Sequence, residues 1–318
     1  MKTILFEFPK GFALLLLFAL AAAPAFSRTI ITGTLSQPEQ MAVRELQRFI
    51  AEAGEAAPVS VPFDRFDVPL EDGSIVFGSY GTNPLIRKYA PSAAGLGPEE
   101  SLVCEKDIGG RRVFFVCGGA PRGAVYAVYS FLRSAGYCFF IDSYQAPETF
   151  SPRLPRAARE KPVFAKRGLL PWHNFLDGPT AWDPEDYRAY IDDLVRTGGN
   201  IVAFHTYDSE PFAAYKENGR YLMGSRLLSS ASSVWGTVPA PASGFAFGTG
   251  RLFDTEYFGA QTTLIPDADR AVEAEQKVMR DALSYARARG LETCLGFEIS
   301  GDPTRPEIRD GFIKRINA

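Results

Sequence analysis

The stretch VFAKRGLLPWHNFLDGPTAWDPEDYRAYIDDLVRTGGNIVAFH, residues 163–205, decides the fold expected for this chain. Its pattern predicts a strand over Val163–Leu170, a helix that begins after Asp183, and a buried strand over Ile201–Phe204. Asp183 is a capping residue followed by proline at the first helical position, and two glycines end the helix. A strand–helix–strand unit of this kind builds barrels and doubly wound α/β sheets with parallel strands.

The only two histidines of the chain, His173 and His205, each follow one of these expected strands. In parallel α/β folds, the carboxyl ends of the strands carry the binding and catalytic groups. Each histidine could contact a hydroxyl group of a ligand or tune a carboxylate there, or it could be a satisfied structural residue. Trp172, next to His173, could stack on the face of a ligand or pack in the core.

Length and composition indicate a soluble globular chain of one large or two smaller domains. Of its 318 residues, 46% are hydrophobic and 22% are charged, and the formal net charge is −3. Because the basic residues are scattered, no nucleic-acid partner is expected. The sequence does not indicate an oligomeric state.

The first 27 residues have the parts of an export signal. Lys2 and Lys10 lie in a basic start, Phe12–Ala23 is an apolar run, and AFS at 25–27 has the small-x-small pattern of a cleavage site. The apolar run is short for a membrane span. We therefore expect a secreted or periplasmic protein that has no membrane association after the signal is removed.

The rest of the chain divides into two domains and a linker. Residues 28–145 alternate short apolar runs with amphipathic helices, which predicts a small α/β sandwich domain. Residues 146–161 are rich in proline and charge and are expected to be a linker. Residues 162–318 hold the strand–helix–strand unit, a long aromatic stretch, an amphipathic helix over Asp267–Arg289 and a third strand over Glu292–Phe297.

The second domain is therefore expected to be the first part, about three β/α units, of a TIM-type barrel. A complete barrel has eight units and about 250 residues, and only about 155 residues follow the linker. We expect the sequence to be a fragment of a longer enzyme or an interrupted reading frame.

Nothing in the sequence predicts a metal or an organic cofactor. No histidine–carboxylate cluster has metal-ligand spacing, and the glycine-rich GGAPRG lacks the lysine and hydroxyl residue of a phosphate loop. The cysteines show no paired spacing, which favours mostly buried free thiols over disulfides. They are Cys104, Cys117, Cys138 and Cys294.

The segment GGAPRGAVYAVYSFLRSAGYCFF carries the most specific pattern of the chain. Its glycines, its Arg122 and its Tyr126 resemble the small α/β domain that precedes the catalytic barrel in several glycoside hydrolase families. These families include the family 20 β-N-acetylhexosaminidases and the α-glucuronidases. The resemblance covers roughly residues 28–145 and includes the earlier helix with Glu45.

The start of the second domain is similar to the same family. PVFAKRG, with Arg167, resembles the P-x-F-x-x-R-G that opens the family 20 barrel, where the arginine binds hydroxyls of the terminal sugar. Asn200, His205 and Asp208 resemble the family's N…H-x-x-D at the second strand. The sequence departs from the family at PWHNF and at the SEPF that follows Asp208. In family 20 the catalytic Asp-Glu pair lies after the fourth strand, which would be beyond residue 318.

The resemblance and the strand ends together predict a carbohydrate pocket. Its expected substrate-binding residues are Arg167, Trp172, His173, Asn174, His205 and Asp208. Glycoside hydrolysis uses two carboxyl groups, and Glu298 and Asp208 are weak candidates for them, although the resemblance places the acid beyond this chain. Alternatively, Arg167 could form a structural salt bridge, and both carboxylates could be solvated loop groups.

The leading hypothesis is an exported glycoside hydrolase that cleaves oligo- or polysaccharide by carboxylate acid/base chemistry. A non-catalytic carbohydrate-binding or surface glycan protein is the main alternative. A polysaccharide lyase or esterase is the third.

Overall fold

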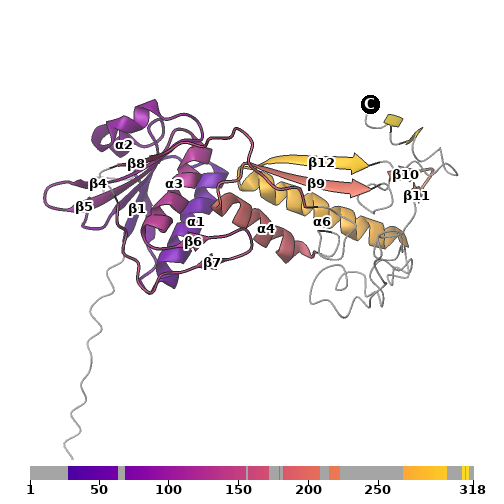
Figure 1. Ribbon diagram of the computed structural model, residues 1–318, viewed down its shortest axis with the longest axis horizontal. Helices are drawn as coiled ribbons and strands as arrows, with labels where there is room; N and C mark the ends of the chain where they lie inside the picture. The colour runs from indigo at the N-terminus through magenta and orange to yellow at the C-terminus, as the bar shows by residue number, and fades with distance from the viewer. Residues whose placement is uncertain are drawn as a thin grey trace, which may run out of the picture.

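In the computed structural model, the chain has a mixed α/β fold with a mostly parallel central sheet (Figure 1). The central sheet belongs to the first half of the chain, and two more parallel strands with their helices extend from it in the second half. The structure describes residues 28–63, 69–154, 157–171, 179, 182–207, 215–222, 268–298, 310–311 and 313–314.

The central sheet has the strand order β2-β1-β3-β5-β4-β8. Four strands, β2, β1, β3 and β5, are parallel, and β4 runs antiparallel to both of its neighbours. The bounds are β1 (Thr29–Thr32), β2 (Val59–Pro62), β3 (Ile75–Ser79), β4 (Ser101–Asp107), β5 (Arg112–Gly118) and β8 (Ala158–Glu160).

Helices cover both faces of this sheet. α1 (Gln37–Glu52) and α3 (Pro121–Ser134) pack on one face, and α2 (Pro84–Tyr89) with the 3₁₀ helix η1 (Pro91–Gly95) lies on the other. α1 begins with a capping box, in which the Glu39 carboxylate accepts the Ser36 backbone N–H (2.8 Å).

The second half contains α4 (Pro184–Arg196), β9 (Ile201–Tyr207), α6 (Ala268–Ala288) and β12 (Glu292–Glu298). β12 pairs parallel with β9, and the register runs from Glu292 opposite Ile201 to Glu298 opposite Tyr207. Figure 1 shows α4 and α6 on the same side of these strands, with both strands pointing away from the central sheet. The amino ends of β9 and β12 therefore lie at the junction of the two halves, and their carboxyl ends are distal.

Two short antiparallel pairs complete the described strands: β6 (Cys138–Phe139) with β7 (Tyr144–Gln145), and β10 (Tyr215–Glu217) with β11 (Arg220–Leu222).

One hydrophobic core runs through the junction. Leu46 of α1 and Phe131 of α3 belong to the same buried cluster as Ile191 of α4, Phe204 of β9 and Met279 of α6. Apolar burial, which contributes about 25 cal/mol per Å² removed from water, therefore stabilises both halves together.

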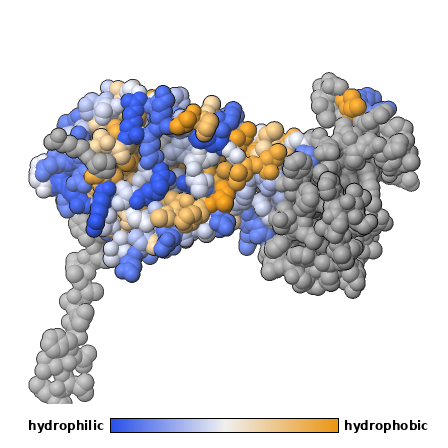
Figure 2. Space-filling model, viewed as in Figure 1, coloured by the Kyte–Doolittle hydropathy of each residue, from blue (hydrophilic) through white to orange (hydrophobic). Residues whose placement is uncertain are grey.

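The structure differs from the sequence-based expectation in two places. Val163–Leu170 forms no strand, and Val163 is 89% exposed. Figure 2 shows hydrophobic residues on the surface where the two halves of the chain meet. In the described part of the chain, the backbone pairing of Val163–Leu170 with β9 is confined to the Arg167 carbonyl, which accepts the N–H groups of Asn200 (2.8 Å) and Ile201 (3.3 Å). Residues 158–160 of the expected linker instead form β8 at the edge of the central sheet, because β4 offers them a free antiparallel edge.

The four cysteines are free thiols, as expected, but only Cys104 and Cys117 are buried, whereas Cys138 and Cys294 are exposed. None of the helices that the structure describes is both long and apolar enough to cross a bilayer.

Candidate functional site

The distal ends of β9 and β12 form the edge at which sequence reasoning placed the chemistry. His205 is half-buried near the carboxyl end of β9 and lies opposite Gly296 of β12. The register brings the backbone of Glu298 beside that of Tyr207 at the last pair of the ladder. Two of the expected residues, His205 and Glu298, are therefore placed on adjacent strands at one edge of the sheet.

Arg167 lies at the opposite end of the strands. Its carbonyl pairs with the first residues of β9, four residues before His205. At a rise of about 3.3 Å per residue, four residues of strand separate these positions by about 13 Å. The structure thus does not bring Arg167 and His205 together.

The Arg167 guanidinium is engaged by the protein itself. Its Nε donates to the Gly198 carbonyl (2.7 Å) and its Nη1 donates to the Phe164 carbonyl (2.7 Å). Its Nη2 donates to Glu99 Oε2 (2.7 Å) and to the Tyr126 hydroxyl (3.1 Å). At least four of the five N–H donors of an arginine side chain are used in this way, which leaves little to offer a sugar. Sugar binding by Arg167 stays a prediction.

Glu99, in the loop before β4, is the centre of this cluster. It accepts from Arg122 Nη1 (2.5 Å), from Arg167 Nη2 and from Asn200 Nδ2 (3.1 and 3.2 Å). Burial acts to raise the pKa of Glu99, but the hydrogen bonds from these three donors outweigh it, so the pKa lies below its usual value. A carboxylate of the first half is thereby kept charged at the amino end of β9.

Asn200 closes the same cluster from the start of β9. Its Oδ1 accepts the Arg167 N–H (2.8 Å), and its Nδ2 also donates to the Ala165 carbonyl (2.7 Å). Gly168 is needed beside it, because a Cβ there would lie 2.2 Å from the Ile201 carbonyl oxygen. These contacts explain the R-G pair and the asparagine of the sequence pattern as parts of the domain junction.

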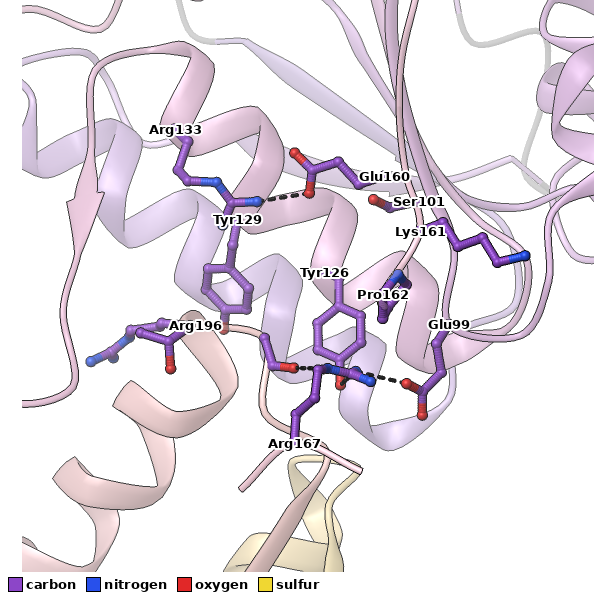
Figure 3. Close-up of a pocket in the computed structure, with 12 residues that line it drawn as sticks. Glu99, Ser101, Tyr126, Tyr129, Arg133, Glu160, Lys161, Pro162, Arg167 and Arg196 are labelled. Carbon is purple, nitrogen blue, oxygen red and sulfur yellow. Dashed lines mark hydrogen bonds and ion pairs between the residues drawn. The ribbon is translucent and has the colours of Figure 1, made fainter. Parts of the chain in front are cut away.

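A cleft of about 210 Å³ opens beside this cluster and is drawn in Figure 3. Arg133 and Glu160 form an ion pair (2.8 Å) at one side of the cleft, and Arg167 reaches Tyr126 and Glu99 at the other. Burial raises the pKa of Tyr126 to about 12, so its hydroxyl stays neutral at pH 7. The cleft has hydrogen-bonding groups, but the charged groups described above bind one another.

A second carboxylate, Glu45 of α1, holds the other side of the junction. It binds Arg196 at the end of α4, Arg289 just after α6, and the Tyr129 hydroxyl. Burial acts to raise the pKa of Glu45, but the two guanidinium charges outweigh it and lower the pKa to about 2. Glu45 is therefore ionised throughout the physiological range.

The other four expected site residues, Trp172, His173, Asn174 and Asp208, lie outside the described residues. Sequence reasoning missed Glu45 and Glu99 as junction residues. Neither stands in a motif with a chemical meaning, and their partners are distant in sequence, so no local signal could have identified them.

Among the residues that the structure describes, no group of three or more histidine, cysteine, aspartate or glutamate side chains could hold a metal ion. Comparison of the chain with protein-family models and with curated proteins found no match to either. The functional assignment therefore depends on the residues themselves.

Proposed function

We propose that this chain is an exported glycoside hydrolase that acts on oligo- or polysaccharide, and that its second half has the β/α arrangement that begins a TIM-type barrel. The supporting observation is the parallel β9–β12 pair. Both helices lie on one side of it, and its carboxyl ends point away from the α/β domain. In barrels of this type, the carboxyl edge carries the substrate site.

The proposed substrate pocket lies at this distal edge. His205 is its described member, and Trp172, His173, Asn174 and Asp208 are its other proposed members, since each comes just after an expected strand. A neutral imidazole can accept or donate one hydrogen bond to a sugar hydroxyl at each ring nitrogen. We assign Arg167 to the junction rather than to this pocket.

The proposed reaction is acid/base cleavage of a glycosidic bond. One protonated carboxyl group gives its proton to the leaving oxygen, and a second carboxylate acts as base or nucleophile at the anomeric carbon. Glu298 and Asp208 are the candidate carboxylates in this sequence.

The test is an assay of the protein on a panel of aryl glycosides and polysaccharides. We expect release of the aglycone or of reducing sugar, and a loss of more than 100-fold in kcat/KM for Glu298→Gln or Asp208→Asn if either supplies one of the two carboxyl groups. Arg133→Ala is the matched control, because its half-exposed pair with Glu160 is remote from the strand ends. No hydrolysis on any member of the panel would contradict the proposal.

The same panel separates the alternatives. Binding to a glycan array without any product would favour a non-catalytic carbohydrate-binding or surface glycan protein. An unsaturated sugar product would indicate a lyase, and release of acetate would indicate an esterase.

A further inference from the structure

Two arginines of the second half converge on one carboxylate of the first half. Arg196 lies in the last turn of α4, and Arg289 follows the end of α6. Arg289 Nη2 donates to Glu45 Oε2 (2.5 Å), and Arg196 binds Oε1 of the same carboxylate through Nε (3.1 Å) and Nη2. The side chain of Arg289 is 2% exposed, that of Arg196 10% and that of Glu45 12%.

Glu45, Arg196 and Arg289 form a buried ionic layer between the two halves. Tyrosine hydroxyls extend this layer on both sides. Tyr129 of α3 donates to Glu45 and accepts from Arg289 Nη2 (2.8 Å). On the other side, Asp192 of α4 binds Arg289 Nε (2.9 Å) and the Tyr285 hydroxyl of α6 (2.7 Å). The layer thus joins α1 and α3 of the first half to α4 and α6 of the second.

Without Glu45, the second half compensates the positive charges of Arg196 and Arg289 less completely. The Nη2 group of Arg289 binds only Glu45 and Tyr129 among the described residues, and both belong to the first half. The acids that remain are Asp192 and Asp193, and burial raises the pKa of each, which disfavours their charged forms. Removing one partner from a buried ion pair leaves an uncompensated charge and is strongly destabilising.

The two arginines are also the residues that connect helices to strands. Arg196 precedes the first residue of β9 by five positions, and Arg289 precedes that of β12 by three. Glu45 therefore holds the point at which each helix turns back into its strand. At these turns α3 of the first half also donates to two backbone carbonyls, from Tyr126 to Gly199 (2.8 Å) and from Arg122 to Gly290 (3.0 Å), but these bonds do not compensate the charges of Arg196 and Arg289.

We propose that Glu45 is a positioning residue that makes the folding of the second half depend on the first. When Glu45 binds Arg196 and Arg289, the turns after α4 and α6 are fixed, and β9 and β12 are held in their parallel register. When it is removed, the β9–β12 pair opens while the central sheet remains folded. This inference is independent of the proposed function, because it concerns how the two strands are held and not what binds at their ends.

Hydrogen exchange on the whole chain tests the proposal. In Glu45→Ala, we expect the amides of β9 and β12 to lose protection by at least tenfold relative to the unaltered protein, and those of β3 and β5 to change by less than twofold. Glu45→Gln, which keeps one acceptor oxygen, should give the same regional pattern with a smaller loss. The matched control is Glu52→Gln on the same helix, which removes a more exposed pair with Arg48 and should leave both regions unchanged.

Arg289→Met supplies an independent measurement if Glu45→Ala does not accumulate as folded protein. It removes the contact from the second half and must open the same two strands. An equal loss of protection in all four strands, in either variant, would show that the layer only adds to global stability and would overturn the proposal. A change confined to α1 and α3, or unchanged exchange at β9 and β12, would overturn it as well.

Discussion

Replacement of Arg167 by alanine separates a junction role for this residue from a sugar-binding role. The change removes the hydrogen bonds to Glu99, Tyr126 and two backbone carbonyls, of Phe164 and Gly198. The Arg167 side chain is 20% exposed, so these bonds are largely shielded from solvent. In the unaltered protein they tie the segment before β9 to the α/β domain.

The magnitude follows from what remains after the substitution. Glu99 keeps Arg122 and Asn200 as donors, so no fully unpaired carboxylate is created. The loss is that of one partly buried bond to a charged acceptor, Glu99, and of three bonds to neutral oxygen acceptors. Net values of about 1.5–3 kcal/mol for a bond to a charged group and about 0.5–1.5 for others, reduced by water that enters the site, give about 2–3 kcal/mol.

Urea unfolding with linear extrapolation measures this difference. Arg133→Ala is the control, because its half-exposed ion pair with Glu160 predicts a loss of only about 0–1 kcal/mol. An Arg167→Ala protein within about 0.5 kcal/mol of the unaltered one would refute the reasoning. If the Arg167→Ala protein kept its stability but lost affinity for a sugar ligand, that result would support sugar binding by Arg167.

Three further predictions concern the pH response, the packing and the thiols. The pKa of Glu45, about 2 in the folded protein, lies below its ordinary value of 4.5. Its contribution is therefore complete above about pH 4.5 and declines as the pH falls toward 2. The stability difference between Glu45→Gln and the unaltered protein should thus shrink between pH 7 and pH 3 in urea titrations. Gly118→Ala should lower the free energy of unfolding by more than about 2 kcal/mol, because its Cβ would lie 1.8 Å from the backbone nitrogen of Ala124 in α3. Gly95→Ala, which has open space around it, should be nearly neutral in the same measurement. The exposed Cys294 should react with a thiol reagent in the native state, whereas Cys117, whose pKa burial raises, should react only on unfolding, as mass spectrometry of labelled protein would show.

Much of the local structure could be predicted from the chain. The capping box at Ser36, the proline after Asp183 and the glycines after α4 are short-range signals, and the structure confirms the helices that they predict. The glycine pair at 109–110 between two apolar runs is a further short-range signal, and both glycines adopt a positive φ in the turn between β4 and β5.

The candidate site was predicted less well. Sequence position suggested that Arg167 and His205 would share an edge, yet one lies at the amino end of β9 and the other near its carboxyl end. The error came from Val163–Leu170, an apolar run whose period cannot distinguish a paired strand from an extended segment. Only the pairing of the Arg167 carbonyl with the first residues of β9 decides where Arg167 lies.

The sequence by itself determined the helices, the sheet strands with strong apolar runs and the class of the fold, because capping, periodicity and turn chemistry act over a few neighbouring residues. The tertiary structure alone decided which charges meet. Glu45 lies 151 positions from Arg196 and 244 from Arg289, and Glu99 lies 68 from Arg167. No spacing rule connects residues so far apart. They come together because packing of α4 and α6 against α1 and α3 buries the arginines, and a buried guanidinium requires a carboxylate beside it.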